Sequence, residues 1–163
     1  MTNYRLHAVG YFISDRGGAP MPNRLASDLF LIELLTVGRV RDPLDETVRE
    51  PGWCFLHRDG EETIWRSPAD EHYECLTIAF DVDTPPPHEH WPRRFPWGSA
   101  REALDFAQEM TQAFHRRGID RAVQGAMLWH HLRYRIALAR SATPPETLPP
   151  QVQRALRFIQ QHY

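Results

Sequence analysis

Histidines and carboxylates are the residues of this chain that could take part in catalysis, most directly by holding a metal ion. Such a site needs two or three imidazoles and a carboxylate that converge on one ion. The one His-x-His pattern, His88-Glu89-His90, lies in a proline-rich stretch where we expect a solvated polar loop. His130 and His131 are neighbours on a predicted helix and point about 100° apart, so they do not simply serve one site. With no Ser-His-Asp order and no phosphate-binding glycine loop, we predict no catalytic residue, no metal and no cofactor, and therefore no enzyme.

The segment CLTIAF at 75–80 alternates between small and bulky side chains. On a strand, Cys75, Thr77 and Ala79 share one face, and the bulky residues between them share the other. Small, weakly polar side chains leave room that a ligand can occupy, whereas the bulky face packs on a neighbouring helix or sheet. We therefore predict that Cys75 and Thr77 line a ligand pocket. The alternative is a tight core in which small residues lie opposite large ones.

Four further residues are candidates for the same pocket. Glu33 interrupts an apolar run (FLIELLTV), so its carboxylate either faces solvent or is buried with a partner such as Arg24. Trp65 and Tyr73 could supply apolar walls with a polar edge, the alternative being that they are ordinary core aromatics. We also assign Phe12, in the first predicted strand, to the ligand-binding set.

Secondary-structure patterns place strands in the first half of the chain and helices in the second, which is an α+β order. Short apolar runs between turn signals predict strands at 7–14, 28–37, 47–50, 52–57, 62–67 and 73–81. Ser99 and Glu102 form a capping box that begins a helix ending before Gly118. A second helix runs from Asp120, a predicted N-cap, to about residue 140.

The second predicted helix carries large apolar residues over a wide arc, which is more than one buried face needs. An exposed apolar stripe usually marks an association site, and a two-fold pairing of like helices is a common way to cover it. We predict a homodimer through Leu128, Trp129, Leu132 and Ile136. The alternative is a helix buried on both sides within one chain.

Bulk composition bounds the function classes. The chain has 163 residues and a formal net charge of −2, which argues against a broad nucleic-acid-binding surface on these residues. No apolar run approaches the roughly 18 residues that a membrane span requires, and the N-terminus lacks a signal-peptide pattern, so we expect a cytoplasmic protein without membrane contact. Cys54 and Cys75 have no metal-binding spacing, and we expect free thiols.

Two segments carry a family resemblance. The sequence LPPQVQRALRFIQQHY at 148–163 resembles the first helix of the DNA-binding domain in AraC-type transcription regulators; the alternative is a terminal helix that packs on its own domain. The segments PGWCFLHRDGEETIW and YECLTIAFDV resemble the cupin barrel of the sensor domains in that family, with Pro51-Gly52 opening a strand, Gly60 turning the chain and Phe80 near the end of a hydrophobic strand. Where a cupin enzyme often has a metal-binding histidine after this glycine, the chain has Glu61, Glu62, Thr63 and Ile64.

The resemblance implies a domain order and a function. It implies a cupin-like jelly-roll barrel at 1–97, a helical dimerisation segment at 98–141, a proline-rich linker at 142–150, and at 151–163 the first helix of a helix-turn-helix domain of which the rest is missing. The implied function is sensing of a small-molecule effector, such as a sugar or related metabolite, with DNA contacted only through the missing domain. Arg24 lies near the place where these sensors have a sugar-contacting arginine. The ligand-binding set is thus Phe12, Arg24, Glu33, Trp65, Tyr73, Cys75 and Thr77. The alternatives are a small metal-dependent cupin enzyme, or a vestigial barrel that serves only assembly.

Overall fold

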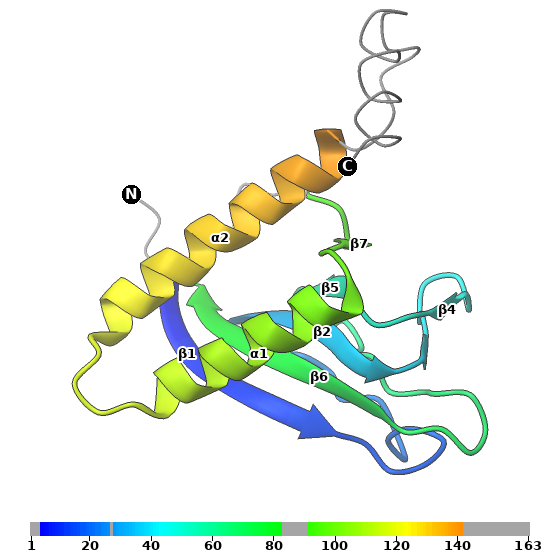
Figure 1. Cartoon of the computed structure of the whole chain (residues 1–163). Helices are drawn as coiled ribbons and strands as arrows, with labels where there is room; N and C mark the ends of the chain where they lie inside the picture. The colour runs from blue at the N-terminus through cyan, green and yellow to red at the C-terminus, as the bar shows by residue number, and fades with distance from the viewer. Residues whose placement is uncertain (1–3, 27, 83–90, 142–163) are drawn as a thin grey trace, which may run out of the picture.

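The computed structural model describes residues 4–26, 28–82 and 91–141, and its main feature is an antiparallel sheet of five strands (Figure 1). The strand order is β1-β6-β2-β5-β7, formed by β1 (Tyr4–Ile13), β6 (Tyr73–Val82), β2 (Leu29–Gly38), β5 (Trp53–His57) and β7 (Arg94–Pro96). Two short strands, β3 (Val40–Arg41) and β4 (Val48–Arg49), pair separately. The predicted α+β class is confirmed.

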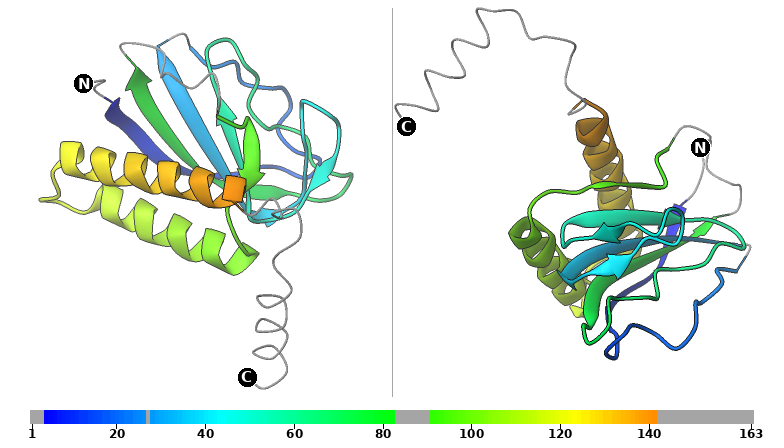
Figure 2. Two further views of the ribbon diagram at one scale, coloured as in Figure 1. Left: turned by 90° about the horizontal axis from the view of Figure 1, so that it is seen from above. Right: turned by 90° about the vertical axis from the view of Figure 1, so that its right-hand side faces the viewer.

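Two helices cover one face of this sheet. Helix α1 (Ala100–His115) and helix α2 (Arg121–Ser141) run side by side in opposite directions across it (Figure 2). The capping box of α1 is formed as predicted, with Ser99 and Glu102 each bonding the other's backbone N–H. Asp120 likewise accepts the N–H of Ala122 at 2.7 Å, as an N-cap does. Both helix starts were thus predictable from local sequence.

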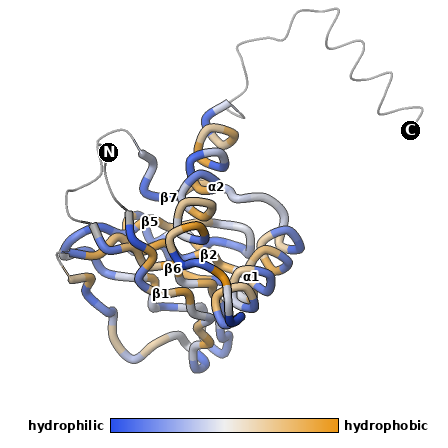
Figure 3. Tube along the Cα trace, turned by 90° about the vertical axis from the view of Figure 1, so that its left-hand side faces the viewer, coloured by the Kyte–Doolittle hydropathy of each residue, from blue (hydrophilic) through white to orange (hydrophobic). Residues whose placement is uncertain are grey.

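The alternation along β6 separates two hydrophobic clusters, one on each face of the sheet. Leu76, Ile78 and Phe80 join the larger cluster beneath the helices, whereas Cys75 belongs to a smaller cluster on the opposite face. Figure 3 shows hydrophobic stretches along the sheet strands and along both helices, which are the elements that contribute the larger cluster. The predicted division of this strand into a small face and a bulky face is therefore confirmed, and the bulky face packs on the helices.

The predicted strand at 62–67 does not join the main sheet. Its residues pair irregularly with 17–25 through isolated bridges, Gly18 with Arg66 and Arg24 with Glu62. Pro20 and Pro22 have no N–H to donate, so a continuous ladder between the two segments cannot form. Within the described ranges the sheet has β1 and β7 at its edges and does not close into a barrel.

Gly52 makes the predicted Pro-Gly turn and ties β5 to the helices. Its φ of +97° lies in the region that favours glycine, and a Cβ there would come within 2.3 Å of the Gly98 carbonyl oxygen. Its own N–H donates to Leu35 and its carbonyl accepts from Trp97, both at 2.8 Å. The predicted linker at 142–150, the helix at 151–163 and His88-Glu89-His90 lie outside the described residues.

His131 connects the two helices through a stack of rings. Its imidazole stacks on both Trp97 and Phe106, with centroids 5.2 and 4.8 Å away and interplanar angles of 23° and 22°, and those two rings also contact each other, so the three rings form one cluster. Arg135 Nε donates to its Nε2 at 3.3 Å, which requires an unprotonated nitrogen there. Burial, and secondarily the charge of Arg135, lower the pKa of His131, with Glu109 opposing.

We therefore expect stability to fall with acidity because of this histidine. The folded state binds the proton less readily than the unfolded chain, so the contribution is complete above the ordinary pKa of about 6.5 and is lost as pH falls from there through the lower folded pKa. Urea midpoints at pH 7.5 and 5.5 should differ less for His131→Phe, which keeps the ring stack, than for the parent protein. His130→Phe, an exposed neighbour, should keep the parent's pH dependence. An unchanged pH dependence in His131→Phe would contradict this assignment.

Candidate functional site

A buried carboxylate and a buried imidazole meet on the sheet face opposite the helices. Glu33 on β2 and His57 on β5 are each 6% exposed at the side chain, and Oε2 of the glutamate lies 2.7 Å from Nε2 of the histidine. The contact has ion-pair distance but not the alignment of a hydrogen bond. The antiparallel register places Leu31 opposite His57 and Glu33 opposite Phe55, so the two polar side chains are diagonal neighbours.

Buried groups and backbone hydrogen bonds surround this pair. Ile64 donates its backbone N–H to Glu33 Oε2 at 2.8 Å, and Tyr73 donates its hydroxyl to the Ile64 carbonyl at 2.9 Å. Burial, reinforced by the charge of Glu33, raises the pKa of the Cys54 and Cys75 thiols well above their ordinary value. Both cysteines are free, as predicted, and both are buried. Such protonated thiols are poor nucleophiles.

His57 also lines a pocket of about 220 Å³ beside the pair. The pocket lining combines apolar residues with charged residues and His57. Its lining residues are Asp42, Pro43, Leu44, Phe55, Leu56, His57, Glu61, Glu62 and Arg93. A mostly apolar hollow with a few fixed polar groups is the usual form of a small-molecule site.

An ion-pair network anchors the loop that forms one wall of the pocket. Asp42 is fully buried and lies 3.2 Å from Arg49 Nε and 2.7 Å from Arg94 Nη1. Its other carboxylate oxygen accepts the N–H of Leu44 at 3.0 Å. Asp45 contacts the same two arginines from the solvent side, at 3.0 and 2.6 Å. These contacts hold the β3–β4 connection against β5 and β7.

The structure places Cys75 and Thr77 on the same face of the sheet, as the alternation predicted, and Glu33 and Tyr73 lie on that face as well. Thr77 is the register partner of Glu33 and is only partly buried. Arg24 does not pair with Glu33; it lies on the surface, 3.4 Å from Glu62. The buried partner of Glu33 is His57, which we did not predict.

The remaining predicted ligand residues lie apart from the pocket lining. Trp65 is half-buried in the segment that runs over the sheet, and the Arg66 guanidinium lies 5.0 Å from its ring. Phe12 on β1 is 40% exposed and its ring lies 5.7 Å from that of Tyr73. None of the seven predicted residues lines the 220 Å³ pocket, and Glu33 reaches it only through His57. Their contact with a ligand stays a prediction.

The four predicted dimerisation residues are buried within the chain. Leu128, Trp129, Leu132 and Ile136 all belong to the cluster between the helices and the sheet, with exposures of 7% or less. Trp129, for example, packs edge-on against Phe80 at 5.4 Å. The surplus apolar surface that we expected on α2 exists, but it lies on the opposite side of the helix. It consists of Val123, Met127, Tyr134 and Leu138, which are 41–65% exposed; we call these four residues the outer stripe.

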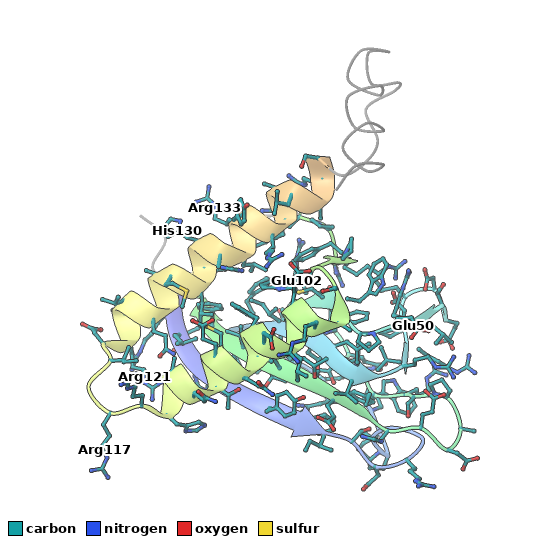
Figure 4. All side chains as sticks on the ribbon, viewed as in Figure 1. Glu50, Glu102, Arg117, Arg121, His130 and Arg133 are labelled. Atoms are coloured by element: carbon teal, nitrogen blue, oxygen red, sulfur yellow. The ribbon has the colours of Figure 1, made fainter. Side chains whose placement is uncertain are left out.

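The outer side of α2 is also basic. His130 and Arg133 project from it away from the sheet (Figure 4). The helix has no acidic residue between Arg121 and Ser141. A signal for the outer stripe was present in the sequence, since its members are four, seven and four residues apart, but the buried residues have an equally good helical spacing.

Three further findings bear on function. Within the described ranges, no three His, Cys, Asp or Glu side chains are grouped so that they could hold a metal ion. No helix in the same part of the chain has the length and apolar character that crossing a bilayer requires. The chain matches no protein-family model, and no curated protein matches it significantly.

Proposed function

We propose that this chain is the effector-sensing and dimerisation part of an AraC-type transcription regulator. The observation that carries the proposal is the buried Glu33–His57 pair at the wall of a pocket on the sheet face opposite the helices. A buried ion pair often adds little to stability relative to apolar residues of the same volume. Its place beside a pocket therefore favours a role in binding.

The cupin-like architecture is part of the same proposal. Gly60 has a φ of +72° in the turn where the resemblance to cupin sensors expects a glycine. The segments 17–25 and 61–67, together with β3 and β4, run along the face that the helices leave free, as the second layer of a sandwich would. The described strands alone form an open sheet, so the jelly-roll assignment rests on the resemblance and on this second layer.

A structural change caused by effector binding would be transmitted to the helices through the strands of the sheet. Along β2, Glu33 faces the pocket side while its neighbours Ile32 and Leu34 lie in the cluster beneath the helices. Along β5, Phe55 lines the pocket while its neighbour Cys54 lies in the cluster beneath the helices. A ligand that shifts these strands therefore changes contacts on both faces, and differential contact in two states is what effector control requires.

We propose that dimerisation uses the outer stripe rather than the four residues first predicted. In an antiparallel pairing of two α2 helices about a two-fold axis between His130 and His131, Val123 lies opposite the partner's Leu138 and Met127 lies opposite the partner's Tyr134. The stripe is thus self-complementary, as an isologous interface must be. DNA contact, on this proposal, belongs to a further domain beyond residue 163, and the protein acts in the cytoplasm.

A ligand screen by thermal unfolding tests effector sensing. A small molecule that binds only the folded state stabilises it by about 2.7 kcal/mol at a hundredfold excess over Kd. We expect at least one metabolite to raise the melting temperature of the parent protein in a saturable way and to lose this effect in Arg93→Ala, which changes the pocket lining. Arg101→Ala, an exposed change on α1, is the matched control. A broad screen without any hit would favour a domain that serves only assembly.

The dimer has its own test. We expect Tyr134→Glu with Leu138→Glu to give a folded monomer in sedimentation velocity, because both side chains are exposed and their replacement leaves the core intact. The control is Gln108→Glu with Gln112→Glu, two exposed changes on α1 that should leave the dimer unaffected. A parent protein that sediments as a monomer at tens of micromolar would contradict the proposed interface.

A further inference from the structure

A histidine lies in the middle of the outer stripe on α2. Met127, His130 and Tyr134 are three and four residues apart, so their side chains lie one above the other on the same side of the helix. His130 is exposed and projects away from the sheet (Figure 4). Among the described residues it makes no hydrogen bond, ion pair or ring contact. A free imidazole therefore interrupts the apolar surface that dimerisation is proposed to use.

The two-fold pairing of the outer stripe brings the two copies of His130 together. With the axis between His130 and His131, the copies differ by one residue in height, a rise of about 1.5 Å. Packed helices lie about 8–10 Å apart between their axes, so two side chains that both point at the partner helix meet in the space between them. A single polar residue at a central position of a helix pair fixes the register at a cost in stability.

The charged groups near His130 include no acid that would neutralise it. Its titratable and charged neighbours on α2 are Arg133 and Tyr134, and in the pairing the same two residues of the partner. Glu109 on α1 acts on His131 instead. The side of α2 that packs on β1 and β7 is the opposite one, so within the described ranges no charged group of these strands faces His130.

Protonation changes how two facing imidazoles interact. A neutral imidazole has one donor and one acceptor nitrogen, so a neutral pair can share a hydrogen bond between one N–H and one bare nitrogen. Two protonated rings have donors only and carry like charges, which repel each other most strongly where water is excluded. Histidine ordinarily gains this charge as the pH falls from about 8 to 5.

We propose that His130 makes the dimer pH-dependent, so that two chains associate while this side chain is neutral and separate when it is protonated. The monomer takes up the proton more readily than the dimer, because in the monomer the imidazole is solvated and has no second copy beside it. By linkage, association is strongest at neutral pH and weakens as the pH falls. This inference rests on the proposed dimer through the outer stripe and adds its regulation.

Sedimentation velocity at constant ionic strength, at pH 7.5 and 5.5, tests the regulation. Dissociation frees two imidazoles per dimer, so Kd can rise by up to about a hundredfold per pH unit, and we expect a rise of about tenfold or more between these two values. His130→Gln, which keeps a polar side chain but cannot gain charge, should have the same Kd at both. His115→Gln, the same change at an exposed histidine on α1, should keep the parent's pH dependence. Circular dichroism at pH 5.5 should show a folded monomer.

A cysteine at position 130 tests the placement separately. Two cysteines form a disulfide only when their Cα atoms lie within about 7 Å. We expect His130→Cys to form a covalent dimer under mild oxidation at pH 7.5, whereas Gln108→Cys, an exposed change on α1, should not. Cys54 and Cys75 are buried and should remain reduced in both variants.

The contrary outcomes are distinguishable. If His130→Gln kept the parent's pH dependence, or if the parent's Kd were equal at both pH values, the dimer would stand and His130 would not regulate it. Failure of His130→Cys to cross-link a protein that still sediments as a dimer would show that the two copies do not face each other. A parent that is monomeric at pH 7.5 would overturn the dimer itself. The urea comparison of His131→Phe with His130→Phe is made below the dimer Kd, where His130 is solvated in the folded and the unfolded chain.

Discussion

Leu132→Glu is expected to unfold this domain, whereas Leu138→Glu, six residues further along the same helix, is expected to leave it folded. Leu132 is 1% exposed between α2 and the sheet. Loss of a buried leucine side chain costs about 2–5 kcal/mol, and an unpaired buried carboxylate adds several more. The sum rivals the whole stability of a typical domain, about 5–15 kcal/mol. Far-ultraviolet circular dichroism and urea titration of both variants would measure the difference.

The comparison of these two leucines shows which side of α2 packs on the sheet and which side is available for dimerisation. Leu138 is 41% exposed, so a glutamate there keeps its hydration and the fold loses little. If Leu132→Glu remained folded and became monomeric, α2 would have to be rotated so that its now buried side faced a second subunit. A folded Leu132→Glu variant would therefore contradict the helix orientation described above.

The orientation of α2 could not be predicted from its sequence because apolar residues occur on both sides of the helix. Leu128, Leu132 and Ile136 share one side, while Met127, Tyr134 and Leu138 form the other. Periodicity identifies a helix face but not the surface that covers it. Contact with the sheet determines which side of α2 is buried. Gly125 on α2 allows the helix to approach β1 so closely that a Cβ there would lie 3.1 Å from Leu6 Cβ. This packing buries the Leu132 side.

Local features of the fold were predictable, and long-range ones were not. The capping box of Ser99 and Glu102 depends on residues three apart, and the alternation along β6 depends on neighbours two apart, so both could be inferred from sequence alone. The segment 62–67 has the composition of a strand, but its pairing depends on the distant Pro20 and Pro22. Closure of a barrel is a property of such distant pairings.

The candidate site shows the same division. The sequence predicts that a carboxylate in an apolar run either faces solvent or is buried with a partner. Glu33 is buried and has a partner. Its partner could not be identified, because His57 becomes a neighbour only when β2 and β5 pair with Leu31 opposite His57. A buried histidine ending the apolar strand WCFLH was the available signal. Two apolar strands each contain one ionisable residue, Glu33 in one and His57 in the other. Pairing the acidic residue with the basic one would have identified the contact.

Asp42→Ala is expected to destabilise the protein by about 3–5 kcal/mol, the range for removal of one partner from a buried ion pair. Asp42 is fully buried, and its loss leaves Arg49 and Arg94, which are 15% and 24% exposed, without their inner counterion. It also leaves the N–H of Leu44 without its acceptor. The urea midpoint would report the loss of stability.

Asp45→Ala is the matched control because Asp45 contacts the same two arginines from the solvent side. At 36% exposure its carboxylate is well hydrated, so its removal should lower the stability far less than removal of Asp42. Because both aspartates contact the same two arginines, the difference between the two variants measures the effect of burying the counterion. Equal losses in the two variants would mean that water reaches Asp42, and the pocket wall would then be held by the β3–β4 pairing rather than by charge.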